Sequence, residues 1–182
     1  MDRPIRHVHE RRFQAPLAEV VAIVDSMWSG GPLDALPRAL GGWRRTPPGA
    51  QGFAAGTRFG HGPFSFLVEH WDGHTLRARV ETVGFRGCHG FVLQREGDHV
   101  LVTHDLDAEG TLGAWMVWQL FIARGHDWAV EALFDRMHVL LSDGGAERAS
   151  SRPPLGMRVF AATRRLLRSA GLAGKRATTV RH

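Results

Sequence analysis

The sequence is poor in cysteine. Cys88 is the single cysteine in 182 residues, so the chain cannot form an intramolecular disulfide or supply a cysteine zinc cluster. No lysine or arginine stands directly beside it to activate the thiol, so we expect Cys88 to be a small, buried apolar side chain and not a nucleophile. This cysteine usage is typical of a reducing compartment, and we expect a cytoplasmic protein.

The sequence also lacks a long hydrophobic run. Its most apolar stretch, TLGAWMVWQLFIA (residues 111–123), has no charged side chain and two tryptophans. Wound as a helix it covers about 20 Å, less than the roughly 30 Å of a bilayer core. The N-terminus lacks the apolar stretch of a signal peptide. We therefore expect this segment to fill a core or line a pocket.

Several catalytic motifs are missing. The sequence has no GxSxG, no phosphate-binding glycine loop, no HExxH and no CxxC. These absences argue against covalent hydrolases and nucleotide enzymes, and they leave acid or base chemistry on a bound ligand open.

Positive charge is confined to one end of the chain. The formal net charge is +5, yet all 18 acidic residues lie at or before Glu147, beside 14 arginines, which gives that part −4. From Arg148 onward, eight arginines and Lys175 stand without an acid, giving +9. A mildly acidic domain with a basic tail does not favour nucleic-acid binding, which needs clustered basic residues on the folded surface.

The N-terminal part predicts a strand followed by a helix. IRHVHERRF (5–13) has a strand-like composition, and Pro16 stands where the first turn of a helix tolerates proline. Apolar residues then recur at helical spacing, at Leu17, Val20, Val21 and Val24. We predict a second short helix over 29–42, bracketed by glycines, and a loop at RRTPPGAQG (44–52).

From residue 56 to 109 the hydrophobic period changes to two. Four strand-length runs are separated by turn sequences: FSFLVEHW (64–71), TLRARVETV (75–83), GCHGFVLQR (87–95) and HVLVTHDLD (99–107). The pattern predicts an antiparallel meander with one apolar and one charged face. His104 falls on the apolar face with Val100, Val102 and Leu106, and His89 shares a face with Phe91.

A long amphipathic helix follows the meander. WAVEALFDRMHVLLSDGG (128–145) has an apolar stripe at helical spacing: Val130, Leu133, Phe134, Met137 and Leu140 or Leu141. We expect a break at RGHD (124–127), with Asp127 capping the new helix. Its stripe has to be buried against the apolar sheet face, so the fold class is α+β.

This element order resembles the SRPBCC superfamily, whose helix-grip or START-like fold wraps a curved antiparallel sheet around a long C-terminal helix. The likeness rests on RRFQAPLAEVVAIV (11–24), GTRF (56–59) and RGHDWAVEALFDRM (124–137), and it covers roughly residues 5–142. It implies a helix-grip domain over residues 1–145, followed by a tail over 146–182. The superfamily includes lipid-transfer domains and polyketide cyclases or dehydratases.

The resemblance implies a hydrophobic cavity between the sheet and the last helix that takes a lipid, polyketide, sterol or other apolar molecule. The wall residues would then include Trp115, Trp118, Phe121 and Trp128. The same aromatic residues are equally compatible with a filled core. No cofactor is expected, and the oligomeric state is left open.

Histidines and one arginine are the candidate polar groups of this cavity. His7, His9 and Arg11 lie two apart along a strand and point to one side, so they would face one end of the cavity. His104 interrupts an apolar strand face, where an imidazole can orient a ligand carbonyl or act as a general acid or base; His89 is a second candidate. A satisfied core histidine is the alternative. Spacing shows no third metal ligand to join His7 and His9, so we expect no metal.

The tail predicts a basic amphipathic helix. Apolar residues gather on one side from Leu155 onward, and the opposite side carries Arg158, Arg164, Arg165 and Arg168. Such a helix folds back on the domain, lies peripherally on an anionic membrane or binds an acidic partner.

The sequence thus favours a carrier or sensor of a hydrophobic small molecule, lipid or polyketide-like. Two alternatives remain: a polyketide cyclase or dehydratase-type enzyme that uses a cavity histidine, and an interaction module that acts through its basic tail.

Overall fold

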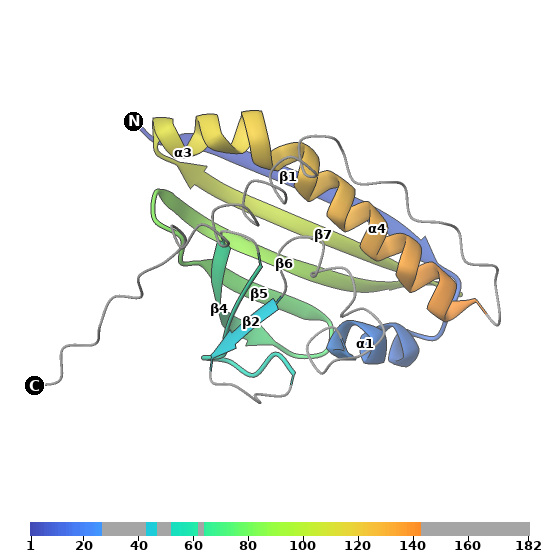
Figure 1. The fold of residues 1–182 in the computed structure, drawn as a ribbon. Coiled ribbons are helices and arrows are strands. Elements are labelled where there is room, and N and C mark those ends of the chain that lie inside the picture. Colours follow the sequence, from blue (N-terminus) through green and yellow to red (C-terminus); the bar gives the residue numbers. More distant parts are fainter. Residues whose placement is uncertain (27–42, 47–51, 62–63, 143–182) are drawn as a thin grey trace, which may run out of the picture.

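The fold is an antiparallel sheet covered on one side by a long helix, as the computed structural model shows for residues 1–26, 43–46, 52–61 and 64–142 (Figure 1). The helix predicted over 29–42 and the tail over 146–182, with Arg158, Arg164, Arg165 and Arg168, lie outside these described residues. The described elements are β1 (Arg3–Phe13), α1 (Leu17–Ser26), β2 (Trp43–Thr46), β3 (Arg58–His61), β4 (Phe64–Trp71), β5 (Thr75–Val80), β6 (Phe85–Glu96), β7 (His99–Gly110), α3 (Leu112–Val117), η1 (Trp118–Ile122) and α4 (Ala123–Leu141).

The sheet has seven strands in the order β1-β7-β6-β5-β4-β3-β2, and every neighbouring pair is antiparallel. The predicted meander is confirmed as β4 to β7. The prediction of a loop at 44–46 was wrong, because Trp43–Thr46 pairs with His61–Arg58 as β2. Local composition favoured a loop, and long-range strand pairing overrides it.

The inner face of the sheet forms the core. The residues that the alternation predicted to be buried lie on this face. On β5, Leu76, Ala78 and Val80 are buried while the two arginines between them are exposed. On β7, Val100, Val102 and Leu106 are buried. Cys88 falls on the other face of β6 and is half-exposed, so the expectation of a buried cysteine was wrong.

The long helix runs without a break from Leu112 to Leu141 as α3, η1 and α4, and its α4 part packs against the inner face (Figure 1). The predicted break at 124–127 was therefore wrong. Val117, Trp118, Ile122 and Ala123 all have right-handed helical angles, and η1 is one wide π turn within the helix. Gly125 is buried, which indicates that it permits close packing instead of ending a helix. Such π turns are frequent at functional sites.

The stripe predicted for the last helix is confirmed. Val130, Phe134 and Met137 are buried, and Leu133, Leu140 and Leu141 pack against the core. At the far end of the sheet, α1 buries Val20 and Val24. Trp71 Nε1 on β4 donates a hydrogen bond of 2.9 Å to Asp25 Oδ1, which ties α1 to the sheet.

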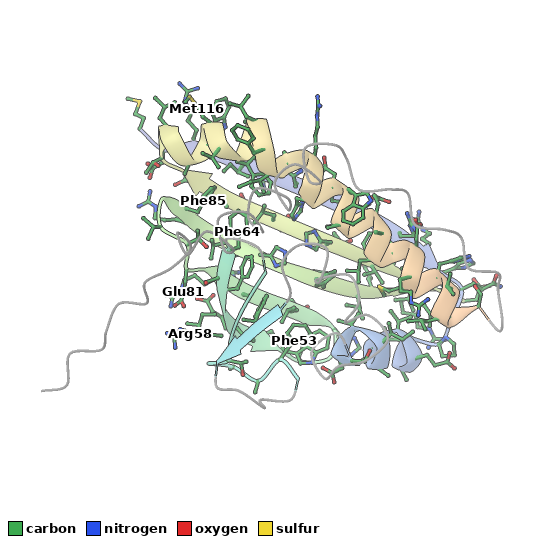
Figure 2. All side chains as sticks on the ribbon, viewed as in Figure 1. Phe53, Arg58, Phe64, Glu81, Phe85 and Met116 are labelled. Carbon is green, nitrogen blue, oxygen red and sulfur yellow. The ribbon has the colours of Figure 1, made fainter. Side chains whose placement is uncertain are left out.

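The apolar segment 111–123 is mostly exposed. Only Trp118 and Ala123 in it are buried, and Leu120 and Phe121 are 69% and 67% exposed. Leu112, Met116 and Val117 are also exposed, so α3 and η1 carry an apolar outer face. Figure 2 shows Met116 on the side of α3 turned away from the sheet. Among the described residues, no helix has both the length and the apolarity needed to cross a membrane.

Candidate functional site

Five histidines converge beneath the long helix, and the sheet order explains why. β1, β7 and β6 are neighbours, so His7 and His9, His104, and His89 stand on three adjacent strands. His9 pairs directly with His104, and His89 lies diagonally across from His104. His126 reaches the same place from α4. Adjacent strands bring opposite and diagonal side chains within contact, which makes this cluster possible.

His89 and His104 form the buried centre of the cluster. They are 7% and 2% exposed, and their Nε2 atoms lie 2.9 Å apart. Two imidazole nitrogens at this distance share one proton, so one ring donates and the other accepts. Phe66 packs against His89, and Phe91 meets His104 edge-on. The pair is therefore held in apolar surroundings.

His126 is the third buried ring. Its side chain is 8% exposed, and neither ring nitrogen has a hydrogen-bond partner among the described residues. Burial lowers the pKa of His126 from its ordinary value, so the ring is neutral and keeps a lone pair. Its ring centre lies 5.0 Å from that of His104 and 5.6 Å from that of His7. His126 thus connects the buried pair to the histidines of β1.

Asp127 gathers the outer part of the cluster. Its Oδ1 atom lies 2.9 Å from His7 Nδ1, 3.2 Å from His9 Nε2 and 4.0 Å from His126 Nδ1. The neighbouring His126 ring, followed by the hydrogen bond to His7, lowers the pKa of Asp127 to about 2. The expectation that Asp127 caps a helix was wrong, because the helix continues through it and its side chain faces β1.

Trp118 fixes the tautomer of His7. Its Nε1 atom donates to His7 Nε2 at 3.3 Å, so this nitrogen accepts and Nδ1 carries the proton given to Asp127. Further along β1, His9 Nδ1 lies 2.8 Å from Glu131 Oε1. His7, His9 and Arg11 share one side of β1, as predicted, and their side chains contact Asp127 and Glu131 of α4. None of the three is among the residues that line the cavity between the sheet and the helix.

A small cavity lies beside the cluster, between the sheet and the helix. Its wall includes Phe64, Phe66, Phe85, Trp118, His89 and His126. Its volume is about 20 Å³, enough for one or two water molecules and far below the roughly 300–1,000 Å³ of ordinary ligand pockets. Figure 2 shows Phe64 and Phe85 at the α3 end of the sheet.

The structure separates the predicted site residues. Trp118 and His89 line the cavity, whereas His104 does not line it and contacts two residues that do, His89 and His126. Trp115 is half-buried, with the Arg3 guanidinium 5.0 Å from its ring centre. Trp128 is half-buried outside the lining, and Phe121 points to solvent.

Sequence reasoning missed His126, although a signal was present. His126 precedes Val130, Phe134 and Met137 at spacings of four, four and three, so it continues the buried stripe of the helix. The sequence prediction began the helix at Asp127, so it left His126 outside the helix and outside its buried stripe. The expectation of no metal rested on the lack of a third ligand beside His7 and His9. The structure brings His126 and Asp127 to those two histidines, and it also places a ring nitrogen from each of His89, His104 and His126 within 4.8 Å of the other two.

Comparison of the structure with solved proteins confirms the helix-grip fold. Norcoclaurine synthase from Thalictrum flavum has a TM-score of 0.59 at 14% identity, over 78% of this chain and 96% of that chain. The KanY protein has a TM-score of 0.54 at 13% identity, over 78% and 99%. Ara h 8.0201 has a TM-score of 0.52 at 12% identity, over 76% and 98%.

One further structure of norcoclaurine synthase holds dopamine and hydroxybenzaldehyde; it has a TM-score of 0.56 at 13% identity, over 76% of this chain and 87% of that chain. No protein-family model matches the sequence, and no curated protein matches it. The chain therefore has the helix-grip fold that its order of strands and helices predicts.

Proposed function

We propose that this protein binds a small aromatic or apolar molecule carrying one polar group, in the cavity between the sheet and the long helix. The supporting observation is the composition of the cavity wall, in which aromatic side chains lie beside the two histidines His89 and His126. Aromatic surfaces contribute apolar contact, and a few placed polar groups fix the orientation of a ligand. Norcoclaurine synthase, which shares the fold, is solved in complex with the compact aromatic molecules dopamine and hydroxybenzaldehyde.

The small volume of the cavity sets a condition on binding. A ligand enters only if side chains move, and we infer that Phe64 and Phe85 move first, because they meet edge-on at 5.3 Å and Phe85 is half-exposed. A compact molecule needs less displacement than a long-chain lipid or sterol. The carrier or sensor role predicted from the sequence is kept for this smaller class of ligand.

An acid–base enzyme is the second candidate, favoured by the contact between His89 and His104. His89 would face the ligand and exchange a proton, while His104 would position its ring through the 2.9 Å contact. A cyclase or dehydratase reaction needs such a group beside an apolar substrate. Under this proposal, His104→Ala retains ligand affinity and loses turnover; equal losses of binding and turnover count against it.

Membrane contact is a third candidate, favoured by the exposed apolar face of α3 and η1. Together with the basic tail, this face would place a cytoplasmic protein peripherally on an anionic bilayer. Flotation with phosphatidylserine vesicles is expected to weaken with salt and to be lost in Leu120→Ser/Phe121→Ser. Flotation that is absent, or unchanged in this variant, contradicts the proposal.

Two valines provide the test of cavity binding. Val80 lines the cavity, and Val83, three residues away, is 98% exposed. One sample of natively purified protein would be unfolded and extracted with organic solvent, and the extract analysed by mass spectrometry. A second, folded sample would be titrated with a panel of compact aromatic amines, aldehydes and phenols by calorimetry. Val80→Phe places a larger side chain in the cavity and is expected to weaken binding more than about tenfold. A tenfold loss of affinity corresponds to roughly 1.4 kcal/mol of binding free energy. Val83→Phe is the matched control. Equal affinities in the two variants would place the ligand elsewhere.

A further inference from the structure

Three of the clustered histidines could form a metal site in which three imidazoles bind the ion and a fourth coordination position is left for water. His89, His104 and His126 each present a ring nitrogen, and these three atoms all lie within 4.8 Å of one another. Around a tetrahedral zinc ion, with bonds of 2.0–2.1 Å, neighbouring ligand nitrogens stand about 3.4 Å apart. The 2.9 Å contact between His89 and His104 has to open slightly and the longer separations have to close. The ring that donates in this contact also has to move its proton from Nε2 to Nδ1, so that both Nε2 atoms present a lone pair to the metal. Changes of this size are within the reach of small side-chain rotations.

The state of His126 is the observation that points to a ligand. Its ring is buried, both nitrogens lack a hydrogen-bond partner among the described residues, and it faces the pair formed by His89 and His104. A buried polar atom without a partner costs roughly 1–3 kcal/mol, and coordination to a metal ion removes that cost. Metal binding would thus satisfy an atom that the protein alone leaves unsatisfied.

A second arrangement of ligands around His126 is less suitable. His7, His9 and Asp127 also bring ligand atoms close to His126. However, the Trp118 hydrogen bond makes His7 Nε2 an acceptor, so Nδ1 carries a proton and already donates it to Asp127. Asp127 Oδ1 lies 4.0 Å from His126 Nδ1, so a shift of about 1 Å would let it accept a hydrogen bond from that nitrogen and direct Nε2 to a metal ion.

We propose that His89, His104 and His126 bind a divalent first-row transition-metal ion, with Zn²⁺ as the preferred ion. Three neutral imidazoles and no carboxylate suit zinc, cobalt, nickel or copper and do not suit magnesium or calcium. His89 and His126 both line the cavity, and its volume of about 20 Å³ accommodates the water molecule that completes a three-histidine site. The metal site shares His89 and His126 with the proposed organic-ligand site, and a titration with the metal alone tests it without an organic ligand.

The first experiment measures binding of the metal alone. Full-length protein without an affinity tag, freed of metal by chelation, is titrated with Zn²⁺ against a chromophoric competitor and with Co²⁺ by visible absorption. We expect one zinc per chain, a higher Tm with zinc, and the intense visible bands of tetrahedral cobalt. A folded protein that binds neither ion at micromolar concentration, or shows the weak spectrum of six-coordinate cobalt, overturns the proposal.

Variants assign the site. His126→Gln is expected to weaken zinc binding more than about 100-fold, and Asp127→Asn, which removes only an orienting group, about 10–100-fold. His138→Gln is the matched control, because His138 is an exposed histidine of the same helix. His126→Cys preserves a ligand, so it is expected to bind cobalt with a new thiolate-to-cobalt band in the near ultraviolet. Wild-type affinity in a folded His126→Gln protein, or no such band in His126→Cys, contradicts the assignment.

Discussion

The Nε2 atoms of His89 and His104 lie 2.9 Å apart in the core, on strands that neighbour each other in the sheet. The two rings share one proton, so each nitrogen depends on the other for its hydrogen bond. The energetic consequence can be measured directly.

Replacing either member of this pair is expected to destabilise the protein by about 1–3 kcal/mol, because the remaining nitrogen loses its buried partner. We predict that His104→Leu and His89→Leu each lower the free energy of unfolding in urea, measured without metal, by this amount. The double variant is expected to lose less than the sum of the two by about 0.5–3 kcal/mol. His138→Leu, at an exposed site, is the control. Strict additivity would show that the 2.9 Å contact contributes nothing.

A glycine in β6 lets two strands pack closely. A Cβ atom at Gly90 would lie 1.9 Å from the backbone oxygen of Leu76 on β5, and backbone cannot move away as a flexible side chain can. Gly90→Ala is therefore predicted to lower the free energy of unfolding by more than about 3 kcal/mol. Gly113→Ala is the matched change in a helix: nothing lies within 4 Å there, and a gain of up to about 1 kcal/mol is expected. A mild loss at Gly90 would mean that the two strands separate at little cost.

Asp105 provides a pH-dependent prediction. Partial burial, followed by the charge of Asp107, raises the pKa of Asp105 above 3.8, and Arg6 opposes this shift. A carboxyl with a raised pKa binds its proton more tightly in the folded state, so its contribution is favourable below pH 3.8 and is lost as the pH rises through the folded pKa. Asp105→Asn is therefore expected to raise Tm at pH 7 by about 2 °C and to give no gain near pH 3.

Asp98 is the control for the sign of this effect. Its hydrogen bond to His99 lowers its pKa, so Asp98→Asn is expected to give no gain in Tm at pH 7. Thermal unfolding followed by circular dichroism between pH 3 and pH 7 measures both variants. A gain at Asp105 that persists at the lowest pH would exclude ionisation as its cause.

The sequence predicted the fold because the fold depends on local patterns. The period-two alternation around Ala78 and the stripe from Val130 to Met137 both identify buried faces, and the structure buries them. The strand Trp43–Thr46 was not predicted, because its own composition resembles that of a loop. It becomes a strand only by pairing with β3, a separate segment of the chain. Register between strands is not encoded in the hydrophobic period alone.

The candidate site could be predicted only in part, for a related reason. Alternation identified His89 and His104 as inward-facing, and strand spacing grouped His7 with His9. Their convergence with His126 depends on the order of β1, β7 and β6 and on the rotation of the helix after its π turn. Cavity volume likewise depends on side-chain packing, which periodicity does not report.

Substitution of Arg11 tests whether the ion pairs between β1 and α4 stabilise the fold. Its Nη2 atom donates to Glu131 Oε2 at 2.6 Å and its Nη1 atom to Asp135 Oδ1 at 2.5 Å, and its side chain is 28% exposed. A lysine ammonium cannot hold two carboxylates in this forked geometry. We predict that Arg11→Lys lowers the free energy of unfolding by about 1–2 kcal/mol at low salt.

The matched variant lies on the same strand. Arg6 meets Asp107 at 3.4 Å, and the two side chains are 74% and 56% exposed. Solvent screens such a pair, so Arg6→Lys is expected to change stability by less than about 0.5 kcal/mol. Urea unfolding of both variants at low and high salt separates the two cases. The Arg11 loss should shrink only partly with salt, because its partners also form hydrogen bonds that ions do not screen. If Arg11→Lys and Arg6→Lys lowered the free energy of unfolding equally, the bridge from β1 to α4 would contribute no more than an ordinary surface ion pair. The position of Glu131 beside His9 would then have to be fixed by packing of the helix alone.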